Sequence, residues 1–378
     1  MLHLLYGPAA SGKTDLLMGR IRTAVAARTP GQVLLVPEQY SHEAERALCA
    51  ACGDSLSLYA EVLSFTGLAR RVAAETGAGE APLLDQGGRL LCMALALGQV
   101  APRLRLFGAA ARRPQMQQTL LGAVDELKTA CVTPDALEQT AARCPGYLGD
   151  KLHDLALVLA AYDAVTAQGH ADPTDRLTRL AERIPASTLG HTGQFYLDGF
   201  TDYTRQELAV VRALLTAGAD VTVCLTLDAL ADGNEIFGTA RHTARVLLDM
   251  ADDCGVPATV EACPARAADT PLRVLEQQLF SYTSAHFDDP AHTISVRTAD
   301  DLTAECAWAA AHALQLVQSG CRWRDIAIAA RGFSDYAPAL ERMCAYYGVP
   351  LYFARRTDLL QKPLVALIRA AYDIVTGG

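Results

Sequence analysis

The hydrophobic positions in the first eighty residues alternate between two periods. Three short apolar runs of the kind that form buried parallel strands occur at Leu2–Tyr6, Gln32–Val36 and Val62–Phe65. The segments after them repeat apolar residues at helical spacing, over Leu16–Val25, Ser41–Leu48 and Thr66–Thr76. Strands that alternate with helices in this way predict an α/β fold built on a parallel sheet.

The pattern changes between residues 84 and 190. Strand signals disappear, and long helical stretches follow at Leu84–Leu97, Gln115–Cys131 and Leu152–Gln168. Alternation then resumes with strands at Phe195–Leu197 and Val221–Leu225 and, beyond residue 290, at Thr293–Arg297, Ile326–Ala330 and Leu351–Phe353. We therefore expect a first α/β part at 1–83, an all-helical insertion at 84–190, the rest of the same sheet at 191–290, and a further α/β unit at 291–378.

Composition places the chain among intracellular globular proteins. Its 378 residues are 51% hydrophobic with a mean hydropathy of +0.14, enough for a large core in two or three domains. A net charge of −9 excludes a basic field over the whole surface, although it allows a local basic groove. The 11 cysteines are scattered, and Cys49-x-x-Cys52 has no second pair for zinc, so we expect free thiols in the cytoplasm. No apolar run reaches membrane-spanning length, and the N-terminus lacks the basic flank of a signal peptide.

Residues 7–14 carry the strongest chemical signal. They read Gly7-Pro8-Ala9-Ala10-Ser11-Gly12-Lys13-Thr14 and fit the phosphate-binding pattern G-x-x-x-x-G-K-[ST] between a strand and a helix. The glycines allow the backbone amides to curl around phosphate oxygens, and the helix N-terminus adds positive potential. Lys13 would reach the β- and γ-phosphates of ATP, and the Thr14 hydroxyl would bind Mg²⁺. Only 4 of the 33 basic residues are Lys, so this Lys stands out in an Arg-rich chain. The alternative is a Gly-containing turn without a ligand.

A nucleotide site of this kind also needs an acidic residue at the end of a strand. Asp198 follows Phe195–Leu197 and is the candidate that would hold Mg²⁺ through water, the alternative being a turn residue. The next residue, Gly199, stands where such NTPases usually carry the Glu that activates water. Without this base, hydrolysis should lose a factor of about 10²–10⁴. Glu207 lies on the following helix, where we do not expect it to reach the γ-phosphate.

These segments together resemble the AddB (RexB) family, which are components of bacterial ATP-dependent helicase/deoxyribonuclease complexes with a superfamily 1 helicase-like architecture. The similarity rests on the loop after the N-terminal strand and on short segments in the order of that family: Val33–Gln39 with Glu43-Ala44-Glu45, Val62–Phe65 with Leu68 and Arg71, Leu197–Phe200 with Thr204-x-Gln206-Glu207, and, near the C-terminus, Arg324–Arg331, Tyr347–Pro350 and Pro363–Val365. The resemblance covers nearly the whole chain.

The resemblance implies a RecA-like domain with the loop, a large helical insertion, and the start of a second RecA-like domain. It implies a heterodimer with an AddA-type subunit, action at DNA double-strand breaks, and a degenerate motor, in agreement with Gly199. A nuclease domain and its iron–sulfur cluster would belong to a C-terminal part beyond this chain. Arg331 would contact the γ-phosphate. Residues expected along single-stranded DNA are Pro37, Glu38, Gln39, Ser64, Phe65 and Thr66, with Phe65 either stacking on a base or packing in the core.

Two other functions are compatible with the same loop. A small P-loop phosphotransferase would use it on a metabolite, although the large helical insertion speaks against this function. A scaffold stabilised by ATP without turnover would need no catalytic base. DNA affinity that falls steeply with salt favours the helicase–nuclease component over the phosphotransferase.

Overall fold

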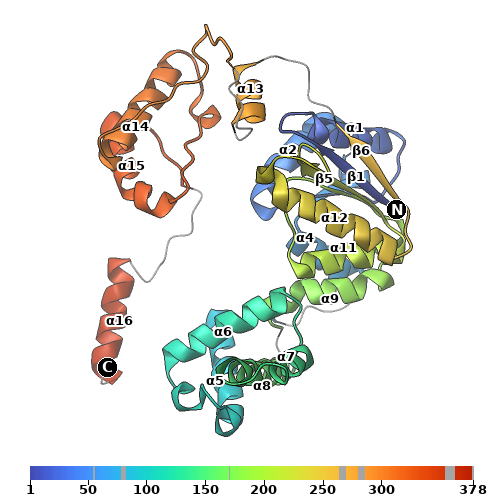
Figure 1. Cartoon of the computed structure of the whole chain (residues 1–378), viewed down its shortest axis with the longest axis vertical. Coiled ribbons are helices and arrows are strands. Elements are labelled where there is room, and N and C mark those ends of the chain that lie inside the picture. The colour runs from blue at the N-terminus through green and yellow to red at the C-terminus, as the bar shows by residue number, and fades with distance from the viewer. Residues whose placement is uncertain are drawn as a thin grey trace. The chain divides into compact units, whose positions relative to one another are not determined.

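The computed structural model (Figure 1) describes residues 1–53, 56–77, 82–169, 171–263, 270–279, 286–353 and 362–376. The chain divides into two compact units, Met1–Ala285 and His286–Gly378. The first unit contains both expected parts of the sheet and the helical insertion between them.

The first unit is built on a six-stranded, all-parallel sheet, which confirms the predicted α/β class. The strands are β1 (Leu2–Gly7), β2 (Gln32–Leu35), β3 (Ala60–Leu63), β4 (Gln194–Leu197), β5 (Asp220–Thr226) and β6 (Ala258–Ala262), in the spatial order β3-β2-β4-β5-β1-β6. The sequence pattern did not predict β6. All five of its residues are exposed, so this edge strand lacks the apolar run that marks the central strands.

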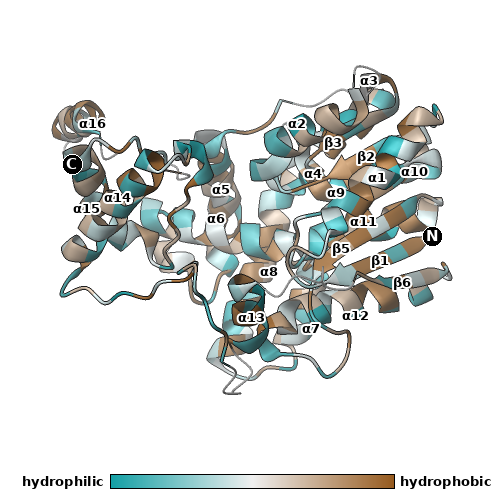
Figure 2. Cartoon of the chain, turned by 90° about the horizontal axis from the view of Figure 1, so that it is seen from above, coloured by the Kyte–Doolittle hydropathy of each residue, from teal (hydrophilic) through white to brown (hydrophobic). Residues whose placement is uncertain are grey.

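Helices cover both faces of the sheet because successive strand residues point to opposite sides. In β5, Val221, Val223 and Leu225 pack on one face against α4 (Phe65–Glu75), α9 (Arg176–Arg183), α11 (Arg205–Ala217) and α12 (Gly238–Asp253). Cys224 points to the other face, which α1 (Lys13–Ala26) and α2 (Ser41–Cys52) cover. Figure 2 shows the strands as mostly hydrophobic between these two layers. Short helices α3 (Leu56–Tyr59), α10 (Thr188–Thr192) and α13 (Pro271–Gln278) complete the unit.

The helical insertion has a core of its own. It consists of α5 (Gln86–Val100), α6 (Pro114–Thr129), α7 (Pro134–Ala141) and α8 (Tyr147–Thr166). Met93, Leu121, Val124 and Tyr162 are among the side chains buried between these helices. The longest helix, α8, has 20 residues, and no helix in the described part of the chain is both long and apolar enough to cross a membrane.

A buried charge network joins the insertion to the sheet domain. The Nζ of Lys128, on α6, lies 2.8 Å from an oxygen of Asp163, 2.8 Å from one of Asp175 and 3.4 Å from one of Asp172. Asp172 is fully buried, and it also pairs with Arg89 of α5. These carboxylates lie on and beside the segment that leads from the insertion into α9. The network therefore fixes the insertion to the layer that covers the sheet.

The second unit contains the helices α14 (Leu302–Gln318), α15 (Phe333–Tyr347) and α16 (Pro363–Thr376). The predicted strands at Thr293–Arg297, Ile326–Ala330 and Leu351–Phe353 are wrong: these segments form no strand ladder within the described residues. Their apolar side chains are partly open to solvent, with Val296 and Tyr352 each 90% exposed. An apolar run becomes a strand only where a neighbouring strand accepts its backbone hydrogen bonds.

Candidate nucleotide-binding site

The loop between β1 and α1 has the backbone geometry of an anion cradle. Ala10 and Gly12 have φ angles of +54° and +88°, in the left-handed region, and no side chain caps the first amides of α1. Alternation of right- and left-handed residues turns successive N–H groups toward one concave point, next to the positive end of the helix dipole. Gly7 is required by packing, since a Cβ there would lie 2.2 Å from the carbonyl oxygen of Cys263.

Lys13 lies inside this loop. Its Nζ donates hydrogen bonds to the carbonyl oxygens of Gly7 (2.8 Å) and Pro8 (2.7 Å) and lies 3.2 Å from Ser11 Oγ. The residue is 7% exposed, and this burial lowers the pKa of the ammonium group. A phosphate oxygen placed there would replace neutral carbonyl acceptors with a charged one and would favour the protonated amine.

The structure brings Thr14 and Asp198 together, although 184 positions separate them along the chain. Thr14 Oγ1 donates to Asp198 Oδ2 at 2.7 Å. Asp198 follows β4, and its backbone N–H donates to the carbonyl of Leu35 at 3.0 Å, which continues the pairing with β2. The hydroxyl and the carboxylate therefore meet at the carboxyl edge of the sheet, where ligands of open α/β sheets bind.

Gly199 has a fixed, left-handed backbone. Its φ is +83°, its N–H donates to Asp198 Oδ1 at 3.0 Å, and a Cβ would lie 3.3 Å from Cδ of Pro37. Glu207 lies at the start of the following helix, α11. It forms a capping box at the start of α11, in which its Oε2 accepts from the N–H and the hydroxyl of Thr204.

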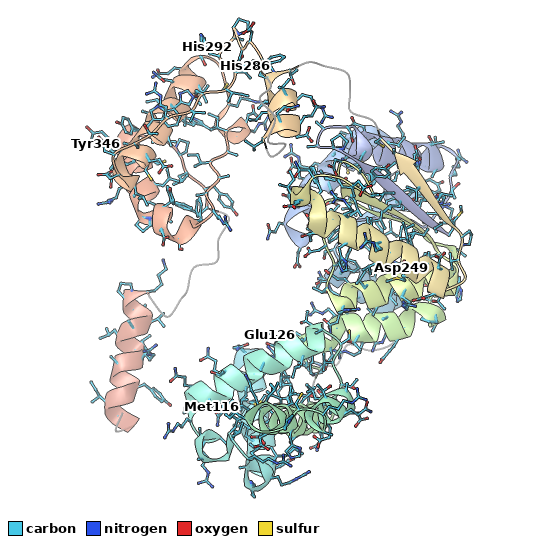
Figure 3. The ribbon with its side chains drawn as sticks, viewed as in Figure 1. Met116, Glu126, Asp249, His286, His292 and Tyr346 are labelled. Carbon is cyan, nitrogen blue, oxygen red and sulfur yellow. The ribbon has the colours of Figure 1, made fainter. Side chains whose placement is uncertain are left out.

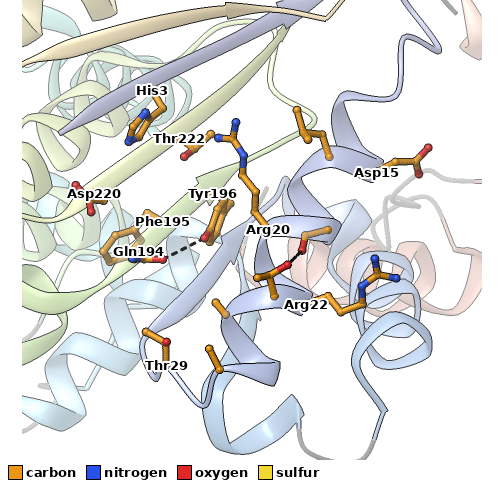
Figure 4. A pocket seen from close by; sticks show the side chains of 15 residues that line it. His3, Asp15, Arg20, Arg22, Thr29, Gln194, Phe195, Tyr196, Asp220 and Thr222 are labelled. Atoms are coloured by element: carbon orange, nitrogen blue, oxygen red, sulfur yellow. Dashed lines mark hydrogen bonds between the residues drawn. The ribbon is translucent and has the colours of Figure 1, made fainter.

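Two cavities lie on either side of the loop. One of about 530 Å³ is lined by residues 9–15 with Asp198, Gly199 and Thr226. The other, of about 360 Å³, is lined among others by Gly7, Pro8, Asn234, Phe237 and Arg273. A third cavity of about 720 Å³ (Figure 4) lies beside α1, among His3, Gln194 and Asp220 at the amino ends of the strands. It is thus at the edge of the sheet opposite to the loop.

The residues predicted to contact DNA have different environments. Glu38 and Gln39 are exposed after β2, and Pro37, Ser64 and Thr66 are half-buried. Ser64 caps α4, its Oγ accepting from the N–H of Gly67. Phe65 is only 6% exposed and packs edge-on against Phe200 and Tyr203, with centroids 5.6 and 6.4 Å away. Burial in this aromatic cluster favours the core-packing alternative for Phe65 over stacking on a base.

Two further positions bear on the site. Arg331 is exposed in the second unit, and its contact with a γ-phosphate stays a prediction. In the first unit, the loop after β5 is organised by Asp228, whose Oδ1 lies 3.2 Å from Arg241 and whose Oδ2 accepts from the N–H of Asn234. Sequence reasoning missed this loop, because an Asp and an Arg 13 positions apart form no recognisable motif.

The first unit is therefore a parallel α/β domain with a glycine-rich anion cradle and a helical insertion. Residues 4–276 match the family model described as "ADDB, N-terminal", and the chain belongs to this family. It is similar to the B subunit of the ATP-dependent helicase/deoxyribonuclease of Desulforudis audaxviator, with 36% identity over 391 positions, 99% of this chain and 34% of that protein. Proteins of the same name from Heliobacterium modesticaldum (32% identity over 99% of this chain and 32% of the relative) and Acetivibrio thermocellus (30% over 99% and 34%) also match. The chain spans about a third of the length of these curated relatives.

Proposed function

We propose that this chain binds Mg·ATP in the loop Gly7–Thr14 and forms the nucleotide-binding N-terminal part of one subunit of a helicase/deoxyribonuclease, which processes DNA double-strand breaks for recombination. One observation carries the nucleotide site: the 2.7 Å contact between Thr14 and Asp198 beside a left-handed phosphate cradle. The names of the relatives support the DNA-processing role.

The residues present fit Mg·ATP. The amides of residues 9–14 and the Lys13 ammonium would hold the β- and γ-phosphates, and Thr14 would bind Mg²⁺ with Asp198 acting through water. Within the described residues there is no group of three or more His, Cys, Asp or Glu side chains that could hold a metal ion. Mg²⁺ at a phosphate site does not need such a group, because one or two protein ligands, water and the phosphates complete its coordination.

The cavities indicate the direction of the nucleotide. Asp198 marks the end at which Mg²⁺ and the γ-phosphate would lie, on the β4 side of the loop. The 360 Å³ cavity lies on the β6 side, beyond Gly7 and Pro8, and contains the aromatic ring of Phe237 and the amide of Asn234. Apolar and amide groups of this kind suit a nucleobase. The base would therefore lie between the loop after β5 and α13.

We infer that ATP acts mainly as a bound ligand, with very slow turnover. Gly199 has no side chain that could act as the general base, and the Glu207 carboxylate is engaged in the capping box of α11. A motor of this kind would support structure and DNA recognition. The same observation is compatible with the scaffold alternative, whereas the relatives offer no support for a phosphotransferase.

We place the single-stranded DNA contacts at the same edge of the sheet. Residues Pro37–Gln39 follow β2, and Ser64 and Thr66 follow β3. Pro37 also packs against Gly199, so the DNA-facing loop and the Mg²⁺ end of the nucleotide site touch. An AddA-type subunit would be the partner in the cytoplasm, and the nuclease with its iron–sulfur cluster would belong to another part of the assembly.

The Lys13→Ala variant tests the nucleotide site. Removal of the ammonium should weaken Mg·ATP binding at least about a hundredfold, since charge-assisted bonds to phosphate contribute about 1.5–3 kcal/mol each and Lys13 can make two. Titration with a fluorescent ATP analogue measures this loss. The control is Lys151→Ala, an exposed lysine on α8. Equal affinity in the parent chain and the Lys13→Ala variant would refute the proposed site.

A further inference from the structure

A basic loop lies at the far end of the helical insertion. Between α5 and α6, residues 101–113 read APRLRLFGAAARR and include Arg103, Arg105, Arg112 and Arg113, all exposed. No Asp or Glu occurs between Asp85 and Asp125. In a chain with a net charge of −9, such a segment is a local departure from the overall charge.

Hydrogen bonds from α8 and two buried side chains anchor this loop to the helical insertion. Asp154 of α8 is fully buried, and its two carboxylate oxygens accept from three successive backbone amides, those of Arg105 (2.8 Å), Leu106 (2.8 Å) and Phe107 (3.0 Å). Leu104 and Ala111 are buried in the core of the insertion. The middle of the loop also packs against its first residue, because a Cβ on Gly108 would lie 2.8 Å from the carbonyl oxygen of Ala101.

The cationic groups are available to a ligand. Arg105 forms one exposed ion pair with Asp150 (2.7 Å). For the guanidinium groups of Arg103, Arg112 and Arg113, no hydrogen bond or ion pair occurs within the described residues. The uncapped N-terminus of α6, with Pro114 as its first residue, adds positive potential next to Arg113. Because the backbone of this loop is already ordered, binding a partner through its arginines loses little conformational entropy.

The position of the loop separates it from the nucleotide site. Figure 3 shows Met116, near the start of α6, at the end of the helix away from the sheet domain, and Glu126 at the nearer end. With 16 residues, α6 places this loop roughly 24 Å from the buried charge network at its other end.

We propose that residues 101–113 form a second DNA-binding surface, which contacts the phosphate backbone independently of sequence and of bound nucleotide. Arginine guanidinium groups match phosphate oxygens in charge and geometry, and such contacts position a protein without reading bases. This surface lies on the insertion and does not require the Gly7–Thr14 loop to bind ATP.

The decisive experiment combines Arg103→Ala, Arg112→Ala and Arg113→Ala in the 378-residue chain. Fluorescence anisotropy measures binding to a mixed-sequence 20-base-pair duplex with a single-stranded tail, at several salt concentrations. We expect affinity to fall at least about tenfold, and the slope of log K against log [salt] to move toward zero by about 2–3, since each phosphate contact on duplex DNA contributes about 0.9 to that slope.

The matched control removes three exposed arginines elsewhere: Arg28, Arg143 and Arg245. It changes the net charge equally, so it should shift the slope by less than about 1. Unchanged DNA affinity in the loop variant would overturn the proposal, and so would a loss in the control as large as in the loop variant. Lys13→Ala should bind this DNA like the parent, which separates a failure here from a failure of the nucleotide site.

Asp154→Asn separates loop geometry from charge. The change removes a negative charge, so electrostatics alone predicts tighter DNA binding. Because an amide NH₂ cannot accept the backbone N–H bonds, the rigid loop predicts weaker binding. Tighter binding by a folded Asp154→Asn variant would contradict the role of loop geometry. If this variant does not fold, the triple arginine variant still decides the proposal, because its side chains are exposed.

Discussion

Introducing a carboxylate at position 199 tests whether the missing side chain or the backbone geometry would keep ATP hydrolysis slow at the proposed site. A Gly199→Glu variant places Glu directly after Asp198, where working ATPases carry their base. If the missing side chain were the only defect, turnover should rise by about 10²–10⁴, equivalent to about 2.7–5.4 kcal/mol of barrier. We expect a rise of less than about threefold, because the backbone at this position is built for glycine.

The magnitude follows from the local geometry. Gly199 has φ +83°, and a side chain there would begin 3.3 Å from the Pro37 ring, directed at the loop after β2. Holding a non-glycine residue in the left-handed region costs about 1–2 kcal/mol. Gly199→Glu should therefore lower the free energy of unfolding by about this amount, and its side chain would start against the Pro37 ring.

The assay compares Gly199→Glu with Gly199→Ala, which has the same backbone strain and the same contact with Pro37 but no carboxylate. Steady-state ATP turnover with Mg²⁺ and DNA, and urea unfolding, are measured for both variants. The two should agree in stability and in turnover. A Gly199→Glu turnover a hundredfold above that of Gly199→Ala would show that the backbone does not prevent catalysis and that only the side chain was missing.

Two further predictions concern the core and the junction. Phe65→Ala should lower the free energy of unfolding by about 3–5 kcal/mol, because a buried ring is removed. The DNA affinity of the folded variant should be unchanged. Lost DNA affinity without lost stability would instead support stacking of Phe65 on a base. Lys128→Ala should cost about 3–5 kcal/mol, because it leaves the buried Asp172 without one of its cations, whereas the exposed Lys151→Ala should cost less than about 0.5 kcal/mol. Equal urea midpoints for these two lysine variants would show that the network contributes nothing to stability.

Much of the candidate site could be predicted because its signals are local. The residues between Gly7 and Thr14 determine their own turn, and the chemistry of amides, lysine and hydroxyl follows from that turn. The periods of the apolar residues likewise indicated the central strands and the helical insertion, since burial on two faces leaves a continuous apolar run and burial on one helix face leaves a stripe. The edge strand β6 was not predicted, and three segments of the second unit were wrongly predicted as strands. Both errors have one cause: strand pairing depends on a neighbouring strand, which the apolar run itself does not specify.

The glycine-rich motif Gly7–Thr14, the order of the first strands and helices, and the family all follow from the amino-acid sequence alone. Three features depend on contacts between residues far apart in the sequence: the burial of Phe65, the hydrogen bond between Thr14 and Asp198, and the anchoring of the arginine loop by Asp154. In each case the deciding partner lies far along the chain: Phe200 and Tyr203 enclose the ring, β4 brings the carboxylate, and α8 supplies the buried acceptor. Local periodicity records which side chains avoid water, but which of them meet is settled by the packing of distant segments.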